Sequence, residues 1–141
     1  MPGKTLALGA GLAVFCFAYA MAQTEVATGP FTEAQVDEGR KVYFARCAGC
    51  HLPGMAGQGD ALALAGYQFM AGWSNRTTQD LYNVIHTSMP QNAPGSLSRQ
   101  QNADILAFVL FKSNFPAGST ELPTQTEVLS TIKFMASKPA Q

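Results

Sequence analysis

The chain has 141 residues, which is enough for one compact domain. Apolar residues make up 47% of it and charged residues 13%, a balance that excludes a disordered tail or a nucleic-acid-binding arm. Nine basic and nine acidic residues cancel, so the chain lacks the strong positive field that a phosphate-binding surface needs. Three cysteines are too few for a disulfide-stapled scaffold or for an all-cysteine zinc site.

Residues 1–22 have the pattern of an export signal. Lys4 supplies a positive charge, residues 6–20 are almost wholly apolar, and residues 20–22 fit the small-x-small rule for cleavage. Cys16 lies inside this segment and is interpreted as an ordinary apolar residue that is removed with it. We therefore expect a periplasmic protein; a retained anchor facing the periplasm is the alternative, although the apolar run is short for a membrane span.

A first helix is predicted after a short lead at residues 23–31. Thr32 can cap this helix and Gln35 can close a capping box with it, and the helix should end near Arg46. A glycine in a helix interior is unfavourable, so Gly39 indicates the close approach of another helix. The residues expected near the buried face are Val36, Gly39, Tyr43 and Phe44.

The next segments alternate between loops and helices. Residues 52–72 are rich in Gly and Ala and are predicted to form a wrapping loop with a short helical turn. Thr77 caps a second helix, with Asp80 in its first turn. Residues 89–95 hold two prolines and a glycine and must be irregular. The apolar stripe of the second helix is predicted at Leu81, Val84 and Ile85.

A third helix is predicted to start at Ser98, to form a capping box with Gln101, and to end near Ser113. Its apolar residues are Ile105, Leu106, Phe108, Val109 and Phe111. The tail at 116–141 is expected to cross the domain as an extended strap or a weak helix. Residues 32–115 would then form one all-α domain of three to four helices, with no strand alternation.

The chemistry-bearing motif is Cys47-Ala48-Gly49-Cys50-His51, a C-x-x-C-H sequence that is typical of covalent c-type haem attachment. Two thiols at this spacing can reach two vinyl groups on one porphyrin edge, and the next residue then places an imidazole on the iron. A disulfide would leave the histidine unexplained. A thioredoxin-like pair would open a helix, whereas this one follows a helix. A zinc site would have only His86 left as a fourth ligand.

Together with the predicted helices, this motif resembles the class I cytochrome c family over about residues 32–113. Gly39 and Tyr43 ahead of the C-x-x-C-H motif match the first helix of the family, and Ala107 and Phe108 match its last helix. The resemblance implies a class I cytochrome c fold around one covalent haem c per chain, bound by Cys47, Cys50 and His51.

The candidates for the second axial ligand by residue type are Met55, Met70, Met89, Met135 and His86, of which Met55 is too close to His51 to reach round the ring. In the cytochrome family a Met-Pro step at the position of Met89 carries this ligand, so the resemblance implies a His51 and Met89 pair. Met70 and His86 stay as alternatives. The resemblance also lets Trp73 donate to a haem propionate, with plain core packing as the equal alternative, and it puts the Leu62 carbonyl where the family uses a proline carbonyl to hold the histidine.

A His/Met pair leaves no open position for a substrate, so the expected function is one-electron transfer rather than catalysis. The donor would be a dehydrogenase and the acceptor an oxidase or another cytochrome. Residues 115–123 are similar to the tails of small cytochromes found with quinoprotein (PQQ) alcohol dehydrogenases. The alternatives are a permanent haem subunit of a periplasmic dehydrogenase, which the low charge favours, and a ligand-sensing haem protein. No nucleic-acid partner is expected, and a membrane partner only if the signal is retained.

Overall fold

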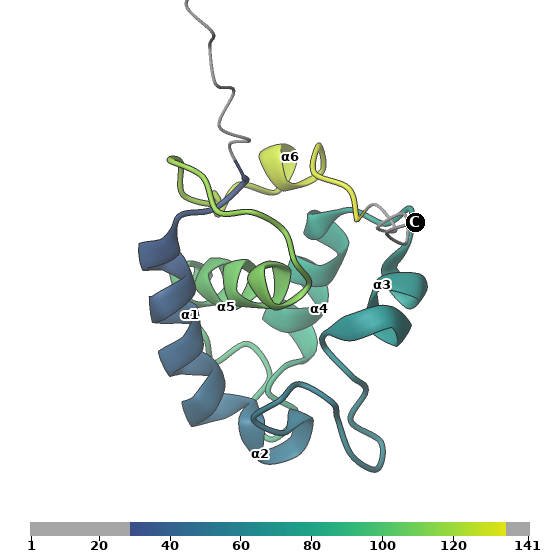
Figure 1. Ribbon diagram of the computed structural model, residues 1–141. Coiled ribbons are helices and arrows are strands. Elements are labelled where there is room, and N and C mark those ends of the chain that lie inside the picture. Colours follow the sequence, from purple (N-terminus) through teal and green to yellow (C-terminus); the bar gives the residue numbers. More distant parts are fainter. Residues whose placement is uncertain (1–28, 135–141) are drawn as a thin grey trace, which may run out of the picture.

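The computed structural model describes residues 29–134 (Figure 1). These residues form helices and contain no strand, although two isolated β-bridges join extended residues. The expected all-α architecture is thus confirmed, whereas the predicted export signal lies outside the described residues. The helices are α1 (Glu33–Arg46), α2 (Ala48–His51), α3 (Gly66–Trp73), α4 (Thr78–Ser88), α5 (Arg99–Lys112) and α6 (Thr126–Leu129).

Side-chain caps start the predicted second and third helices as expected. The Thr77 hydroxyl accepts from the backbone N–H of Asp80, and the Asp80 carboxylate accepts from the backbone N–H of Thr77, which completes a capping box at the start of α4. Ser98 and Gln101 form the same arrangement at the start of α5. Each box satisfies two backbone donors that a helix start otherwise leaves unpaired.

The start of α1 differs in one respect. Thr32 caps the helix, accepting from the backbone N–H of Gln35 at 3.2 Å. The predicted return bond from the Gln35 side chain is wrong, because that side chain lies in the interior. Its Oε1 accepts from the backbone N–H of Leu122 at 2.7 Å, and its Nε2 donates to the carbonyl of Leu122 at 3.0 Å. A distant backbone partner has replaced the local one.

The helices α1 and α5 cross at Gly39, which confirms the close helix approach predicted from a glycine inside α1. A Cβ atom there would lie 1.9 Å from the carbonyl oxygen of Asp104 and 3.0 Å from the Cβ of Phe108. One turn further along α1, the ring of Tyr43 meets that of Phe108 edge-on, with centroids 5.4 Å apart. The absence of a side chain at Gly39 therefore sets how close the two helices pack.

Three of the residues expected on apolar faces are exposed instead. Phe44 is 51% exposed, Val84 39% and Phe111 43%. Each is adjacent in sequence to a buried residue, and adjacent residues on a helix point about 100° apart. These side chains therefore point away from the core. The other expected residues are buried: Val36, Gly39, Tyr43, Leu81, Ile85, Ile105, Leu106, Phe108 and Val109.

Helix α3 is longer than the short turn predicted for this region. Its N-cap, Ala65, offers no side-chain oxygen to the first backbone donors. Burial stabilises it instead, because Phe69 is 3% exposed and its ring meets that of Phe134 edge-on at 5.8 Å. Phe134 is more than 60 residues away from α3 in the sequence, so the residues of α3 and its flanks do not by themselves predict this helix.

Residues 114–134, here called the strap, run across the top of the molecule from the end of α5 to α3 (Figure 1). The strap is mostly extended and contains the one-turn helix α6, so the tail combines both predicted forms. Thr78, at the start of α4, donates its hydroxyl to the carbonyl of Leu129 at 2.7 Å and its N–H to that of Ile132 at 2.8 Å. Within residues 29–134, no helix has the length and hydropathy that crossing a bilayer requires.

Candidate haem site

The C-x-x-C-H motif lies where α1 ends and α2 begins. Cys47 caps α1 through a bond from its N–H to the carbonyl of Tyr43 at 2.8 Å, and its own carbonyl then accepts from the N–H groups of Cys50 at 3.1 Å and His51 at 2.9 Å. Cys47, Cys50 and His51 therefore occupy positions i, i+3 and i+4 of one helical turn, which share a face. The two thiols are not joined to each other.

The imidazole of His51 is held from behind by the segment that follows it. Its Nδ1 lies 2.8 Å from the carbonyl oxygen of Leu62. A carbonyl only accepts, so Nδ1 carries the proton and Nε2 keeps its lone pair, as a metal ligand requires. The expectation that the Leu62 carbonyl holds the histidine is thus confirmed.

Residues 52–64 form a loop fixed at its start and closed on itself. The buried Tyr43 hydroxyl donates to the carbonyl of Leu52 at 2.6 Å, and the N–H of Gly57 donates to the carbonyl of His51 at 3.0 Å. Gly57 has φ +72°, and a Cβ there would lie 2.2 Å from the carbonyl oxygen of Ala61, so only glycine fits. Because the loop closes at Ala61, the next residue, Leu62, lies beside the imidazole of His51.

The surroundings of Cys47 argue against a reactive thiolate there. Burial raises the pKa of the Cys47 thiol to about 11, with Arg46 lowering it and Cys50 raising it further. Redox-active and metal-binding cysteines have depressed pKa values, because the thiolate is the reactive form. In addition, residues 29–134 contain no group of three His, Cys, Asp or Glu side chains that would hold a metal ion. The donor set fits haem attachment better than a disulfide exchanger or a zinc site.

Met89 directly follows α4 as its C-cap, and its N–H donates to the carbonyl of Ile85 at 3.1 Å. The irregular segment that begins there returns toward the motif, since Nη2 of Arg46 donates to the hydroxyl of Ser96 at 2.8 Å. Arg46 immediately precedes Cys47. Met89 is half-buried, whereas Met70 is 8% exposed and Met55 is fully buried.

Trp73 closes α3 and lies half-buried in an aromatic cluster. Its ring centroid is 6.0 Å from that of Phe69 and 5.8 Å from that of Phe134. The guanidinium of Arg76 lies over the indole at 5.1 Å from its centroid. The packing alternative for Trp73 is thus observed, and its contact with a haem propionate remains a prediction.

Two polar residues near the site have contacts that sequence reasoning missed. Tyr43 was predicted only as part of an apolar face, and its hydroxyl bond to Leu52 was not anticipated. Asn102 is a fully buried amide in α5, whose Nδ2 contacts Nδ1 of His86 at 3.2 Å. An amide within the apolar run of α5 is a weak signal of such a contact, but its partner is 16 residues away.

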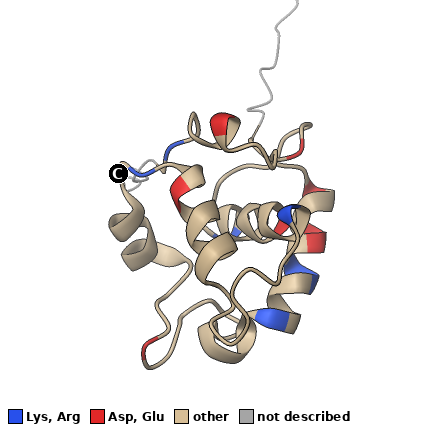
Figure 2. Ribbon diagram, turned by 180° about the vertical axis from the view of Figure 1, so that it is seen from behind, with Lys and Arg blue, Asp and Glu red and all other residues tan. Residues whose placement is uncertain are grey.

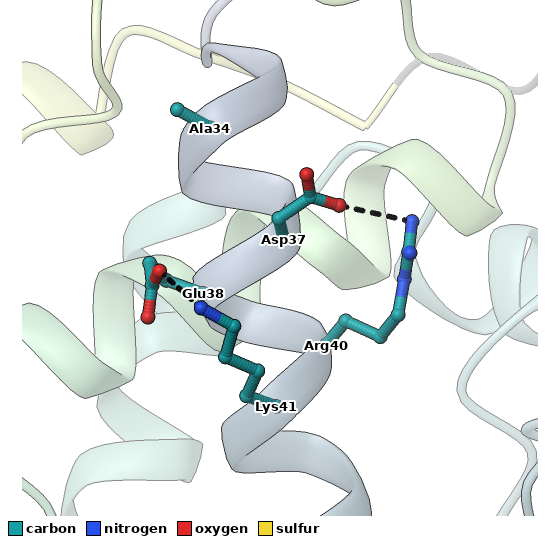
Figure 3. Close-up of a pocket in the computed structure, with 5 residues that line it drawn as sticks. All are labelled: Ala34, Asp37, Glu38, Arg40 and Lys41. Atoms are coloured by element: carbon teal, nitrogen blue, oxygen red, sulfur yellow. Dashed lines mark hydrogen bonds and ion pairs between the residues drawn. The ribbon is translucent and has the colours of Figure 1, made fainter.

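A hollow of about 400 Å³ on the outer face of α1 is separate from this site (Figure 3). Ion pairs between Arg40 and Asp37 at 3.2 Å and between Lys41 and Glu38 at 2.6 Å cross its floor. All four side chains are at least half exposed, so each pair contributes little stability. The hollow is a solvated helix face.

Comparison with known proteins gives two matches. Residues 34–109, more than half of the chain, match the family model described as Cytochrome C oxidase, cbb3-type, subunit III. A chain in the crystal structure of the sulfane dehydrogenase SoxCD from Paracoccus pantotrophus has a similar fold, with a TM-score of 0.51 and 18% identity over 92% of this chain and 68% of that one. No curated protein matches. With the C-x-x-C-H motif on one helical turn inside the matched region, the chain belongs to the cytochrome c family of this model and is a monohaem class I c-type cytochrome, an electron-transfer protein with covalently bound haem c.

Proposed function

We propose that the chain is an exported one-electron carrier in which Cys47 and Cys50 hold the haem by thioether bonds and His51 and Met89 are the axial ligands of its iron. The haem supplies a one-electron Fe(III)/Fe(II) couple. The observation that carries the proposal is the 2.8 Å contact between Nδ1 of His51 and the Leu62 carbonyl, because it places the N–H at Nδ1 and leaves the lone pair of Nε2 for the iron.

Burial supports Met89 as the second ligand. A fully enclosed sulfur such as that of Met55 has no free approach for an iron ion, and Met70 is nearly as enclosed. His86 is occupied differently: its Nδ1 contacts Asn102, its ring stacks on Tyr82, and it lines a polar pocket together with strap residues 124–127. Met89 is only partly buried and lies in the segment that returns to the motif.

The ligand pair determines what this protein can do. A thioether is a soft donor that favours ferrous iron and raises the reduction potential relative to two imidazoles. Because the protein fills both axial positions, no substrate site is left at the metal. The residues around it serve to hold a fixed coordination in both oxidation states, so electrons enter and leave with little rearrangement.

The partners we propose are a periplasmic dehydrogenase as donor and an oxidase or another cytochrome as acceptor. Figure 2 shows where the charged residues lie, which bears on whether the protein diffuses between its donor and its acceptor. Charged residues gather along α1, whereas residues 47–75, which contain the motif and α3, include a single charged residue, Asp60. Free shuttles commonly use strong charge asymmetry to steer their encounters. This distribution favours the second candidate function, a permanent haem subunit of a dehydrogenase complex.

The attachment and the ligands are tested on the purified full chain. Acidified organic solvent should leave the colour on the polypeptide, and a pyridine haemochrome should report thioether-linked haem. The ferric protein should show the far-red methionine–iron absorption band, which Met89→Ala abolishes and the matched Met70→Ala retains. Persistence of the band in Met89→Ala would contradict the ligand assignment, and extraction of the haem would contradict the attachment.

The choice between carrier and subunit rests on association. A permanent subunit should co-purify with a larger flavoprotein or quinoprotein at moderate salt, because an interface with few charges is weakly screened. A carrier should elute as the isolated chain at the same salt concentration.

A further inference from the structure

The segment 89–98 that carries Met89 has little structure of its own. Its internal backbone hydrogen bonds are those from Ala93 to the carbonyl of Pro90 at 2.8 Å and from Ser96 to that of Ala93 at 3.3 Å. An irregular loop of this kind is held in shape by contacts made to it from the surrounding elements. The contacts at its two ends, where it leaves α4 and enters α5, therefore matter most.

Asn102 joins these two ends. Its side-chain Nδ2 donates to the carbonyl of Ser98 at 2.8 Å and to that of Leu97 at 3.3 Å, which are the last residues before α5. The same nitrogen lies 3.2 Å from Nδ1 of His86, in the last turn of α4. One buried amide thus connects the turn before Met89 to the end of the segment.

The direction of these hydrogen bonds is fixed by their acceptors. The carbonyls of Leu97 and Ser98 accept only, so the NH₂ end of the Asn102 amide must face them and Nδ1 of His86 accepts as well. The opposite end, Oδ1 of Asn102, is buried without a partner. Leaving a buried acceptor unpaired is unfavourable, so the contacts of the NH₂ group, whose two hydrogens are shared among the three acceptors, determine how this amide is oriented.

A second link lies beside the first. Tyr82 stacks on His86, with ring centroids 5.9 Å apart and planes inclined by 29°, and its hydroxyl donates to the carbonyl of Arg99 at 3.4 Å. Tyr82 and His86 are one turn apart on α4. Together with Arg99 and Asn102 they form the base of the Met89 segment, a name we use for these four residues.

We propose that Asn102 is a positioning residue for the axial methionine: bonded to His86, it closes the base of the Met89 segment and sets how readily Met89 leaves the iron. Met89 follows His86 by three residues and is the C-cap of α4, so it moves with the last turn of that helix. The inference rests on the proposed ligation by Met89.

The test is a titration of the ferric protein with imidazole, which competes with Met89 for the iron. Loss of the far-red band measures how much Met89 has been displaced. Removing one or two hydrogen bonds from the base should shift this equilibrium toward imidazole by roughly five- to thirty-fold. We expect this shift for Asn102→Leu, which keeps the branching at Cγ and removes every hydrogen bond of the amide, although the leucine side chain is somewhat larger. We also expect it for His86→Phe, which keeps the stack on Tyr82 and removes only the acceptor.

Three further variants separate positioning from general stability. His86→Gln returns an acceptor for the amide but lacks a ring to stack on Tyr82, so its imidazole affinity should lie between those of the wild type and His86→Phe. Thr87→Ala changes the same turn of α4 outside the base and should leave that affinity unchanged. The double variant Asn102→Leu/His86→Phe should bind imidazole only slightly better than Asn102→Leu, because Asn102→Leu already lacks the contact to His86.

Two failures can be told apart. If Met89→Ala retains the far-red band, the ligand assignment fails and the inference falls with it. If Met89→Ala loses the band while Asn102→Leu and His86→Phe bind imidazole as the wild type does, the inference alone is overturned. If Asn102→Leu does not fold, His86→Phe and its Gln counterpart still decide the question.

Discussion

At Gly39 a single hydrogen atom in place of a side chain allows the two longest helices to meet. The backbone of Asp104 occupies the space where a Cβ would lie, at 1.9 Å, and backbone cannot move aside as the end of a flexible side chain can. Gly72, near the end of α3, is a contrasting case, because a Cβ there meets nothing within 4 Å. Two helical glycines thus have opposite physical roles.

We expect Gly39→Ala to lower the free energy of unfolding by about 1–3 kcal/mol or more, since α1 and α5 must separate to accept the methyl group. Gly72→Ala should be neutral or raise that free energy by about 0.5–1 kcal/mol through lower entropy of the unfolded chain. Urea unfolding followed by haem absorbance measures both. Equal midpoints for the two variants would show that the crossing is looser than described.

Asp104 is a carboxyl group buried at the same crossing, 7% exposed. Burial raises its pKa above 3.8, and a hydrogen bond from Gln100 at 2.8 Å partly offsets this, while Glu121 and Glu38 raise the pKa further. A pKa that is higher in the folded state stabilises the fold below pH 3.8, and this stabilisation disappears as pH rises through the folded value.

Asp104→Asn removes the buried charge and keeps an oxygen acceptor for Gln100. We therefore expect the variant to have a higher free energy of unfolding than the wild type at neutral pH, and the advantage to vanish at an acidity where the wild-type carboxyl is protonated in both states. Urea unfolding across this pH range measures it. A variant that is less stable at neutral pH would mean that the carboxylate is stabilised in the fold.

Among the elements, the third positions of α1 and α5 are both glutamine and behave differently. Gln101 closes a local capping box by accepting from the backbone N–H of Ser98 at 2.9 Å. Gln35 instead holds both backbone groups of Leu122, 87 residues away. The two residues have the same sequence signature, and the burial of Gln35 at 3% exposure decides between the two outcomes.

Gln35→Ala should therefore release the strap, whereas Gln101→Ala should only weaken one helix start. We expect a loss of about 1–3 kcal/mol for Gln35→Ala, from two backbone groups left without partners, and less than about 1 kcal/mol for Gln101→Ala. Hydrogen exchange at the Leu122 amide distinguishes them, because it should speed up in Gln35→Ala alone. Equal exchange rates in both variants would contradict the conclusion that the Gln35 side chain holds the strap at Leu122.

The same contrast explains how far the sequence predicts this protein. Local signals were sufficient for the starts of α1, α4 and α5 and for the motif, and the resemblance to the cytochrome c family supplied the carbonyl of Leu62. Helix α3 was under-predicted because it has no capping side chain and depends on Phe134, a ring from the other end of the chain. The bond from Tyr43 to Leu52 and the contact between Asn102 and His86 were missed for the same reason: these partners become neighbours only after folding.

At the scale of the whole molecule, the strap joins elements that do not otherwise share a contact surface. It bonds to Gln35 of α1 and to Thr78 of α4, and it ends at Phe134, whose N–H donates to the carbonyl of Arg76 at 3.0 Å. The ring of Phe134 is 1% exposed and meets those of Phe69, Trp73 and Phe115 at centroid distances of 5.8 to 6.0 Å. The strap is thus continuous with the core.

Phe134→Ala tests whether strap and helices unfold as one unit. Removing this buried ring should lower the free energy of unfolding by about 3–5 kcal/mol, whereas Phe111→Ala, at a 43% exposed position, should change it by less than about 1 kcal/mol. If the unit is cooperative, far-ultraviolet circular dichroism and haem absorbance should give coincident urea transitions in both variants. An early transition in Phe134→Ala, with the haem signal unchanged, would mean that the strap detaches from a domain that stays folded without it. Coincident transitions would mean that α3, which contains Phe69 and Trp73, stays packed only while Phe134 of the strap contacts these two rings.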